Sequence, residues 1–224
     1  MKKLCAILVM SISLVLVFSI SAFAETDRVT AYVDTYGYGT WTIDDDYYYD
    51  NDDEEDDGSL DGVIVGMDIP IQRFKLGFEY EDGSPDDGDY VVLRDYTTLI
   101  IKCGFRVFGN DRVRIDLTLN NFENEYAETK ATVSGIIFGA DALWNISEQM
   151  FLQGSLGVSL NGEYEYDSDE EDAYITLCRI KFNYMFAENF GLGFGYRFNS
   201  ILIDYADEVV TTTGGLTIGV TARF

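Results

Sequence analysis

The feature that most constrains this chain is an alternation of apolar and polar residues that runs from about residue 28 to the last residue. The clearest instance is GLTIGVTARF at 215–224, in which every second residue is apolar. Residues 112–120 and 150–164 repeat the pattern. Because successive side chains of a strand point to opposite faces, this alternation predicts β-strands with one apolar and one polar face. No helical stripe of comparable length occurs after residue 24.

Ten segments show this alternation, with ends placed to within a few residues. They are 28–43, 59–71, 74–82, 90–108, 112–123, 130–144, 150–166, 173–186, 190–205 and 212–224. Their connections alternate between tight turns and generally longer acidic stretches, which is typical of an up-and-down membrane barrel. We therefore predict an all-β fold, a closed up-and-down antiparallel transmembrane β-barrel of ten strands. Eight strands is the alternative, because segments 59–71 and 74–82 are the least regular.

The first 24 residues have the layout of a secretory signal peptide. Lys2 and Lys3 precede an almost wholly apolar run, and Ala22 and Ala24 occupy the small-residue positions of a cleavage site. The alternative is a retained N-terminal anchor, because the apolar run is long enough to span a membrane. We expect cleavage, which leaves residues 25–224 as a single barrel domain.

Charged residues in the segments distinguish a barrel in lipid from a soluble sheet protein. In a soluble sheet the charged face meets water, and bases are scattered over turns and surface. Here eleven of the thirteen basic residues after residue 24 lie on or next to the polar face of a segment. They are Arg73, Lys75, Arg94, Lys102, Arg106, Arg112, Arg114, Arg179, Lys181, Arg197 and Arg223. The acids on that face are Asp34, Asp68, Glu79, Asp116, Asp141 and Glu163.

The opposite face of the segments is apolar and carries most of the aromatic residues. They are Phe74, Phe78, Tyr80, Phe105, Trp144, Tyr164, Tyr174, Phe182, Tyr184, Phe186, Phe190, Phe194, Tyr196 and Phe224. A polar interior with an apolar, aromatic exterior is the arrangement of an outer-membrane barrel. The alternative is a β-sandwich with an ordinary aromatic core, because patterning alone does not say which face meets water.

The lumen of such a barrel has two interpretations. A ten-stranded barrel is only slightly wider than the eight-stranded kind whose interior side chains fill, so paired charges would occupy it. In the alternative, a narrow porin-like channel would have an acidic mouth that attracts cations and a basic waist. We favour the filled lumen. Its expected charges are Asp34, Lys102, Arg106, Arg114, Asp116, Asp141 and Arg197.

Three stretches carry a resemblance to a known group of proteins. Residues 215–224 resemble the C-terminal strand that Gram-negative outer-membrane barrels present to their assembly machinery, and 150–157 and 186–198 resemble hairpins of small outer-membrane β-barrel proteins. The resemblance implies a closed barrel in the cell outer membrane, surrounded by lipid. It also implies that Phe224 acts as an assembly signal recognised by the barrel assembly machinery.

Composition excludes several other functions. A net charge of −25 repels phosphate backbones, so we expect no nucleic-acid partner. The chain has no histidine, which excludes Ser-His, Cys-His and zinc–imidazole chemistry, and no carboxylate pair stands out. The alternation puts Cys103 and Cys178 on the apolar face of two segments that are not neighbours. We therefore expect both thiols to be free and inert. We therefore expect no enzyme and no cofactor.

The longest acidic stretch, residues 44–57, contains ten acids and no base. Its weak candidates for binding calcium or magnesium are Asp52, Asp53, Glu54, Glu55, Asp56 and Asp57. Residues 53–58 match the start of an EF-hand loop, but Ile64 stands where the twelfth-position glutamate is needed. The favoured interpretation is a solvated acidic loop.

The function that we predict is structural or surface-interacting, through acidic extracellular loops that meet cations or an external ligand. The alternatives are a small porin-like channel and an adhesin.

Overall fold

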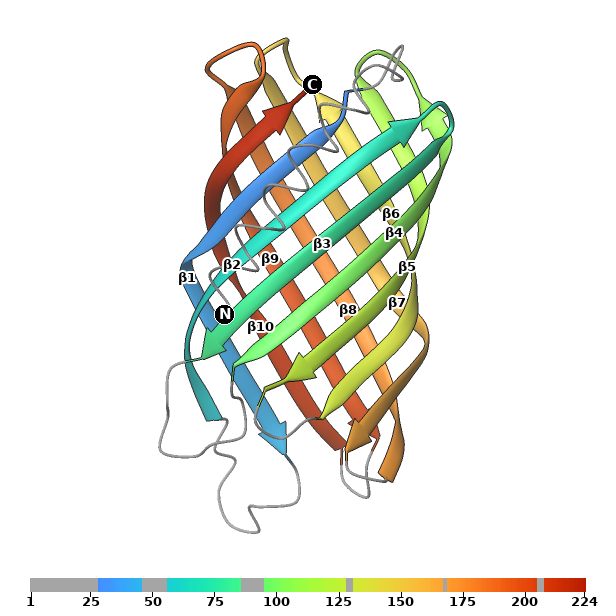
Figure 1. The fold of residues 1–224 in the computed structure, drawn as a ribbon, viewed down its shortest axis with the longest axis vertical. Helices are drawn as coiled ribbons and strands as arrows, with labels where there is room; N and C mark the ends of the chain where they lie inside the picture. The colour runs from blue at the N-terminus through green and yellow to red at the C-terminus, as the bar shows by residue number, and fades with distance from the viewer. Residues whose placement is uncertain (1–27, 46–55, 86–94, 128–130, 167–168, 205–207) are drawn as a thin grey trace.

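The computed structural model describes residues 28–45, 56–85, 95–127, 131–166, 169–204 and 208–224. They form one closed sheet of antiparallel strands in which each strand pairs with the next and the first pairs with the last (Figure 1). The strands are β1 (Thr30–Asp45), β2 (Asp56–Ile71), β3 (Phe74–Pro85), β4 (Tyr96–Gly109), β5 (Val113–Tyr126), β6 (Thr132–Asn145), β7 (Met150–Tyr166), β8 (Asp169–Met185), β9 (Phe190–Asp204) and β10 (Glu208–Arg223). No helix among the described residues is long and apolar enough to cross a membrane. The predicted ten-stranded closed barrel is confirmed, and the eight-stranded alternative is wrong. The signal-peptide residues 1–24 lie outside the described part of the chain.

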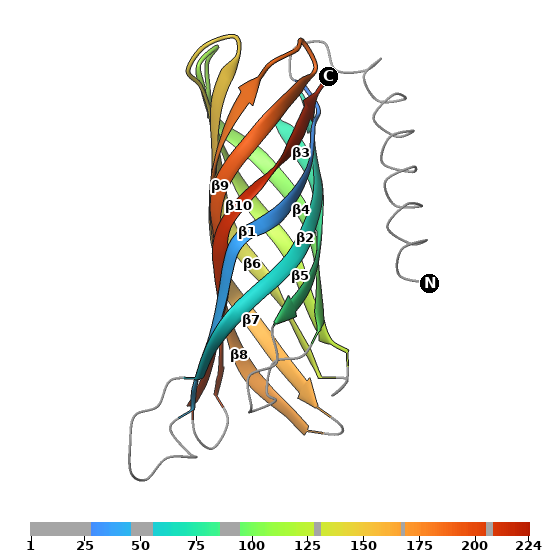
Figure 2. The same cartoon turned by 90° about the vertical axis from the view of Figure 1, so that its left-hand side faces the viewer.

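The barrel is a tall cylinder with two different rims (Figures 1 and 2). The turns that follow β2, β4, β6 and β8 lie at one end together with the C-terminus, and we call this end the short-turn rim. The strand ends that the other five connections join lie at the opposite end, which we call the loop rim. The strands are 12 to 17 residues long, more than the 9–11 residues with which a tilted strand crosses a bilayer. The wall is therefore taller than a membrane requires.

Side chains close the turns of the short-turn rim. The side-chain oxygen of Asn110 accepts a hydrogen bond from the backbone N–H of Val113 at 2.7 Å, and that of Ser147 accepts one from Met150 at 3.1 Å. Between β2 and β3 the turn has only two residues, and its first, Gln72, has φ of +56°. Residues other than glycine rarely adopt this left-handed region, so the tight turn strains the backbone at Gln72.

A β-bulge in β7 changes which side chains face the lumen. Leu160 is an extra residue between the two that pair with Ile136 and Ile137 of β6. Because one added residue reverses the alternation, Glu163 is exposed and Tyr164 packs against buried apolar side chains. The expectation that Glu163 lies in the lumen, with Tyr164 on the outer face, is therefore wrong.

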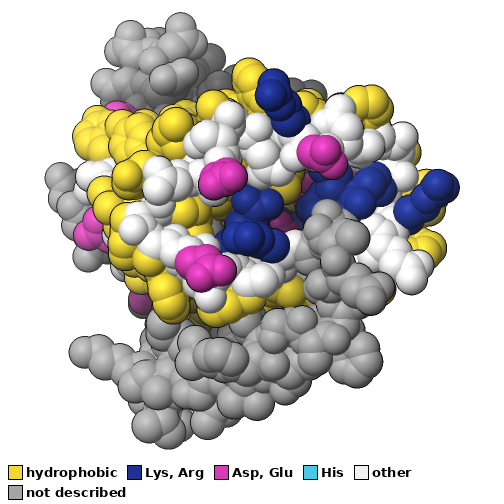
Figure 3. Space-filling view, turned by 90° about the horizontal axis from the view of Figure 1, so that it is seen from above, with side chains coloured by type: hydrophobic (Ala, Val, Ile, Leu, Met, Phe, Trp, Pro, Cys, Tyr) yellow, Lys and Arg dark blue, Asp and Glu magenta, His cyan; other side chains and the backbone are white. Residues whose placement is uncertain are grey.

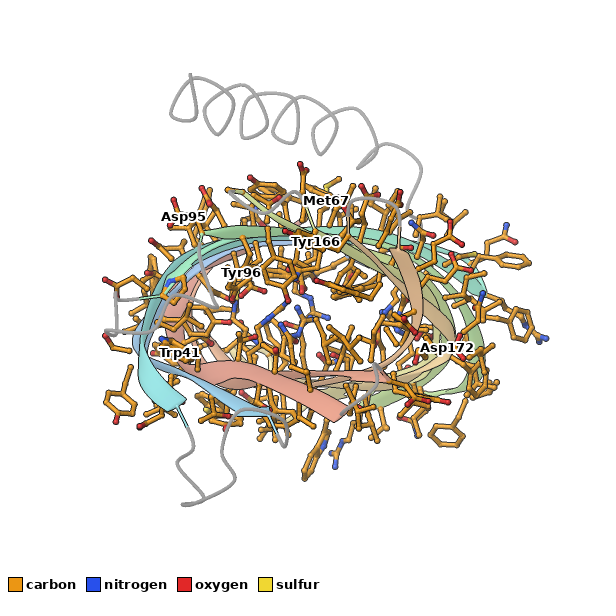
Figure 4. All side chains as sticks on the ribbon, turned by 90° about the horizontal axis from the view of Figure 1, so that it is seen from below. Trp41, Met67, Asp95, Tyr96, Tyr166 and Asp172 are labelled. Carbon is orange, nitrogen blue, oxygen red and sulfur yellow. The ribbon has the colours of Figure 1, made fainter. Side chains whose placement is uncertain are left out.

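Away from this bulge and from the register shifts in β1 and β4, the two faces of the wall differ as the alternation predicts. The outward side chains of Leu156, Phe194 and Ile218 are 60%, 56% and 52% exposed, whereas the inward side chains of Lys102 and Arg197 are buried. Figure 4 shows side chains on both sides of an oval wall. The described strands all belong to one closed sheet, with its apolar face outward, so the β-sandwich alternative is wrong.

Candidate functional site: the barrel lumen

The half of the lumen nearest the loop rim is filled mostly by apolar side chains, which we call the apolar layer. Buried among them are the polar side chains of Thr98, Asn124, Asn199, Thr211 and Thr213. Strands β1, β2, β4, β5, β6, β8 and β9 contribute buried aromatic and aliphatic side chains to the apolar layer. The apolar layer consists of Tyr36, Trp41, Leu60, Ile64, Tyr96, Ile100, Phe122, Val133, Ile137, Ala173, Ile175 and Ile201. Tyr32 packs against it from the short-turn side, beside Arg179 and Lys181. Seen from the loop rim, Tyr96 lies inside the wall (Figure 4). We predicted paired charges throughout the lumen; this half holds mainly apolar side chains instead.

Glu79 of β3 is the centre of a charged cluster in the middle of the lumen. Its carboxylate accepts hydrogen bonds from Arg179 at 2.6 Å and Lys102 at 3.3 Å, and also from Tyr32 and Arg197. These four partners come from β8, β4, β1 and β9 respectively. One buried carboxylate therefore connects strands on opposite sides of the barrel and crosses the lumen.

Glu81, two residues along β3, joins this cluster to the apolar layer. It accepts hydrogen bonds from the hydroxyl groups of Tyr36 and Tyr96 at 2.7 and 2.8 Å. Its other oxygen lies 2.6 Å from the guanidinium of Arg197. Arg197 thus contacts both Glu79 and Glu81, so each of its two carboxylate partners offsets part of the cost of burying charge.

A second group of ion pairs lies on the short-turn side of Glu79. Lys181 donates to both oxygens of Asp34 at 2.6 and 2.8 Å, and Lys75 pairs with Asp141. Arg114 lies 3.0 Å from the carboxylate of Asp116, and Arg106 lies 3.8 Å from it. The seven charges expected in the lumen are thus all found in ion pairs: Asp34, Lys102, Arg106, Arg114, Asp116, Asp141 and Arg197.

Other members of these ion pairs were not among the seven. Lys75, Glu79, Arg179 and Lys181 have the polar-face parity, but the sequence does not show which charges on that face lie at the same height. Glu81 was not assigned to this face, although it stands two residues after Glu79 and the same alternation would have found it.

A cavity of about 1130 Å³ opens at the short-turn rim, and we call it the vestibule. Its lining includes Arg28, Arg106, Arg112, Arg114 and Arg223. In Figure 3, which looks onto this rim, Lys and Arg side chains gather across the middle of the face. The cavities deeper in the barrel are far smaller: one beside Glu79 has about 20 Å³ and one beside Tyr96 about 10 Å³. Spaces of that size hold about one water molecule, so the vestibule narrows to a filled lumen.

The acidic candidates for a metal site lie largely beyond what the structure describes. Asp52, Asp53, Glu54 and Glu55 are outside the described residues, as is the side chain of Asp56; Asp57 is exposed. Within the described residues, no group of three or more histidine, cysteine, aspartate or glutamate side chains is arranged to hold a metal ion. Cys103 and Cys178 are free thiols.

Phe224 ends the chain at the short-turn rim. Its backbone N–H donates to the carbonyl of Val29 at 2.9 Å, and its ring meets that of Phe190 edge to face, with centroids 6.2 Å apart. The terminal residue is therefore held in the wall, next to the seam between β1 and β10.

Comparisons with known proteins identify structures of the same general kind. No family model matches the sequence, and no curated protein matches it. A solved outer membrane channel from Pseudomonas putida F1 aligns over 90% of this chain and 97% of its own, with 14% identity and a TM-score of 0.49. Neisserial surface protein A aligns over 89% and 100%, with 10% identity and a TM-score of 0.38, and the KdgM porin over 84% and 98%, with 10% and 0.34. At these identities and TM-scores the likeness extends to no ligand and no activity.

Proposed function

We propose that this chain is an exported, non-enzymatic outer-membrane β-barrel with a closed lumen. Its role is structural or surface-interacting, through the acidic connections of the loop rim. Removal of residues 1–24 as a signal peptide belongs to this proposal, and both termini of the mature chain then face the periplasm.

The outer face of the wall supports a lipid environment. Its exposed side chains are leucine, isoleucine, valine and aromatic residues on every part of the barrel, a far larger apolar surface than soluble proteins carry. Near the short-turn rim, Phe74, Phe105, Trp144, Phe186 and Phe190 are all exposed. Aromatic residues in such a position form the interfacial girdle of outer-membrane barrels.

The single observation that carries the closed-lumen assignment is the apolar layer. Buried side chains such as Phe122, Ile137 and Ile175 fill the lumen at the loop rim, and the cavity beside Tyr96 has only about 10 Å³, so a hydrated ion would have to lose its water to pass. Glu79 and its four partners add a second obstruction on the short-turn side of this layer. This argues against the porin-like alternative.

The loop rim supports a role at the cell surface. Glu123, Glu125, Glu163, Glu165 and Asp172 lie near the loop ends of their strands and are exposed. Carboxylates this close to a membrane surface repel one another and other anions, and divalent cations relieve that repulsion. We therefore propose that cations, or an external ligand that tolerates this charge, meet the barrel at the loop rim.

The experiment that tests the closed lumen is conductance across a planar lipid bilayer. The mature chain, refolded in detergent and shown to be folded by heat-modifiable migration, should give no steady single-channel steps. Steady steps of uniform size would contradict the closed lumen and favour the porin-like channel. Surface proteolysis of intact cells, which should cleave at the loop rim and spare the short turns, tests the orientation.

A deletion of residues 44–58 tests the role of the longest acidic loop. If that loop carries the surface interaction, the variant should fold and migrate as the parent protein does but lose binding to cells or to divalent cations. Unchanged binding would assign the interaction to another part of the loop rim.

Recognition of Phe224 by the barrel assembly machinery is tested by Phe224→Ser. The variant should refold in detergent but accumulate unassembled in cells, which the heat-modifiable fraction of isolated membranes reports. Phe190→Ser is the control, because it removes the same ring contact without changing the last residue. Equal assembly defects in the two variants would assign the effect to packing and contradict the signal role.

A further inference from the structure

We propose that the vestibule is a binding site for a small, multiply charged anion that carries phosphate or carboxylate groups. The vestibule is the largest cavity described above, and its volume of about 1130 Å³ is at the upper end of the range of small-molecule sites. The chain as a whole repels anions, since it has 40 acids and 15 bases. Five of its arginines nevertheless line this one cavity.

The arginines of the vestibule come from separate parts of the barrel and converge on one space. Arg106 is on β4, Arg114 on β5 and Arg223 on β10, while Arg28 precedes β1 and Arg112 lies in the turn between β4 and β5. A guanidinium group presents a planar set of N–H donors that fits a carboxylate or a phosphate in a bidentate manner. Convergence of several such groups favours a ligand with more than one negative charge.

Acids also line the vestibule, but most of them lie at its edge. Asp111, Glu148 and Glu188 are exposed on the turns of the short-turn rim, where solvent and salt screen their charge. Deeper in, Asp68 lines the wall. Beneath it the single carboxylate of Asp116 serves two arginines, at 3.0 and 3.8 Å.

Among the charged side chains of the vestibule that are not exposed, positive charge is therefore in excess. Arg106, Arg114 and Arg223 stand against Asp68 and Asp116, a formal charge of +1 in a pocket whose walls are protein. Charge in a cleft with low-dielectric walls acts more strongly than the same charge on an open surface.

Arg223 is held in place before any ligand arrives. Its guanidinium stacks on the ring of Phe151, 4.7 Å from the centroid, and one of its nitrogens donates to the side-chain oxygen of Asn145 at 3.2 Å. A side chain fixed in this way loses little further freedom on binding, which favours affinity.

The vestibule is suited to binding rather than passage. Its inner end meets the Lys75–Asp141 and Arg114–Asp116 ion pairs, and the cavity beside them has only about 20 Å³. A ligand would enter and leave by the same opening. The periplasmic orientation of this opening rests on the proposed function, whereas the binding site does not depend on it.

The test is direct binding of anions to the mature chain, residues 25–224, in nanodiscs of zwitterionic lipid. Isothermal titration with inorganic pyrophosphate and, separately, with citrate should give saturable binding of at least one of them, weakened by added NaCl. Binding of pyrophosphate alone would assign the site to phosphates, of citrate alone to carboxylates, and of both to anions of either kind. Absence of saturable binding by either would overturn the proposal.

Matched variants locate the binding. The double substitution Arg106→Gln and Arg223→Gln should weaken binding by about tenfold or more, because two charge-assisted contacts are lost. Arg73→Gln is the control, since Arg73 is exposed at the same rim but outside the cavity lining, and it should bind as the parent does. The Lys replacements at 106 and 223 keep the charge and should bind with intermediate strength.

Heat-modifiable migration of each variant establishes that it has folded. A folded Gln double variant that binds as tightly as Arg73→Gln would overturn the proposal. Because conductance is measured separately, an open lumen would contradict the proposed function without changing this result.

Discussion

Tyr96 lies directly across the β3–β4 ladder from Gly83, with its ring over the glycine backbone: a Cβ added to Gly83 would come within 2.6 Å of the tyrosine hydroxyl oxygen. The same hydroxyl donates to Glu81. The glycine therefore provides the space that lets the ring reach its carboxylate partner at the edge of the apolar layer.

From this contact we expect Gly83→Ala to destabilise the barrel. The methyl group would displace the ring of Tyr96 and disturb its hydrogen bond, at a cost of about 1–3 kcal/mol in the free energy of unfolding. Urea unfolding in phospholipid vesicles, followed by tryptophan fluorescence, measures this. Gly154→Ala is the control, because the nearest atom to its added Cβ is 3.8 Å away. Equal losses in the two variants would contradict the steric explanation.

Neutralising Glu79 should be more costly. Glu79→Gln keeps the shape but removes the negative charge that faces Lys102, Arg179 and Arg197, and leaving buried charge uncompensated costs about 3–5 kcal/mol. The same unfolding measurement checks it. Glu123→Gln, at an exposed position, should change stability by less than about 0.5 kcal/mol. A loss at Glu79 no larger than the loss at Glu123 would contradict the central role of that carboxylate.

The β2–β3 turn offers a stabilising substitution. Gln72 occupies the left-handed region, which costs a non-glycine residue about 1–2 kcal/mol, whereas glycine adopts it freely. After allowance for the greater freedom of glycine in the unfolded chain, Gln72→Gly should stabilise the barrel by up to about 1 kcal/mol. Arg73→Gly in the same turn gains no such relief and should be neutral or destabilising. A stability change of the same sign in both variants would count against the strain at Gln72.

Three acids at the loop rim lie in one row. Asp172 of β8 stands directly opposite Glu163 of β7 on one side and Asp204 of β9 on the other, and all three are exposed. Like charges in opposite positions repel, so Asp172→Asn should stabilise by about 0.2–1 kcal/mol at low salt and by less in 1 M NaCl. Asp61→Asn, whose partner on β3 is Ser84, should give a smaller and less salt-dependent change. Equal salt dependence in both would show that the row is without effect.

The alternation of side chains predicts the ten strands because it depends on the local geometry of each strand. It also assigns Lys102 and Arg197 to the inside and Phe194 to the outside, as the structure has them. The alternation does not reveal an inserted residue such as Leu160, because a bulge forms only when the partner strand is in place. That is why Glu163 was assigned to the wrong face.

The alternation tells which side chains face the lumen, but it does not predict which of them lie at the same height along the barrel axis. Ile100 and Lys102 share the inner face of β4, yet one packs in the apolar layer and the other pairs with Glu79. Which side chains meet across the lumen depends on the stagger between neighbouring strands. That stagger is set by pairing across the whole sheet. Pairings such as Lys181 with Asp34, which are 147 residues apart, depend on it as well.

The apolar layer has a consequence for how the two ends of the molecule influence each other. Only about 10 Å³ of space remains beside Tyr96 in this layer, so we expect the carboxylates of the loop rim and the guanidinium groups at the opposite opening each to exchange ions with the solvent on their own side alone. Each end is thereby independent of the other. Substitutions in the connections of the loop rim can therefore change its charge without disturbing the arginines that line the vestibule.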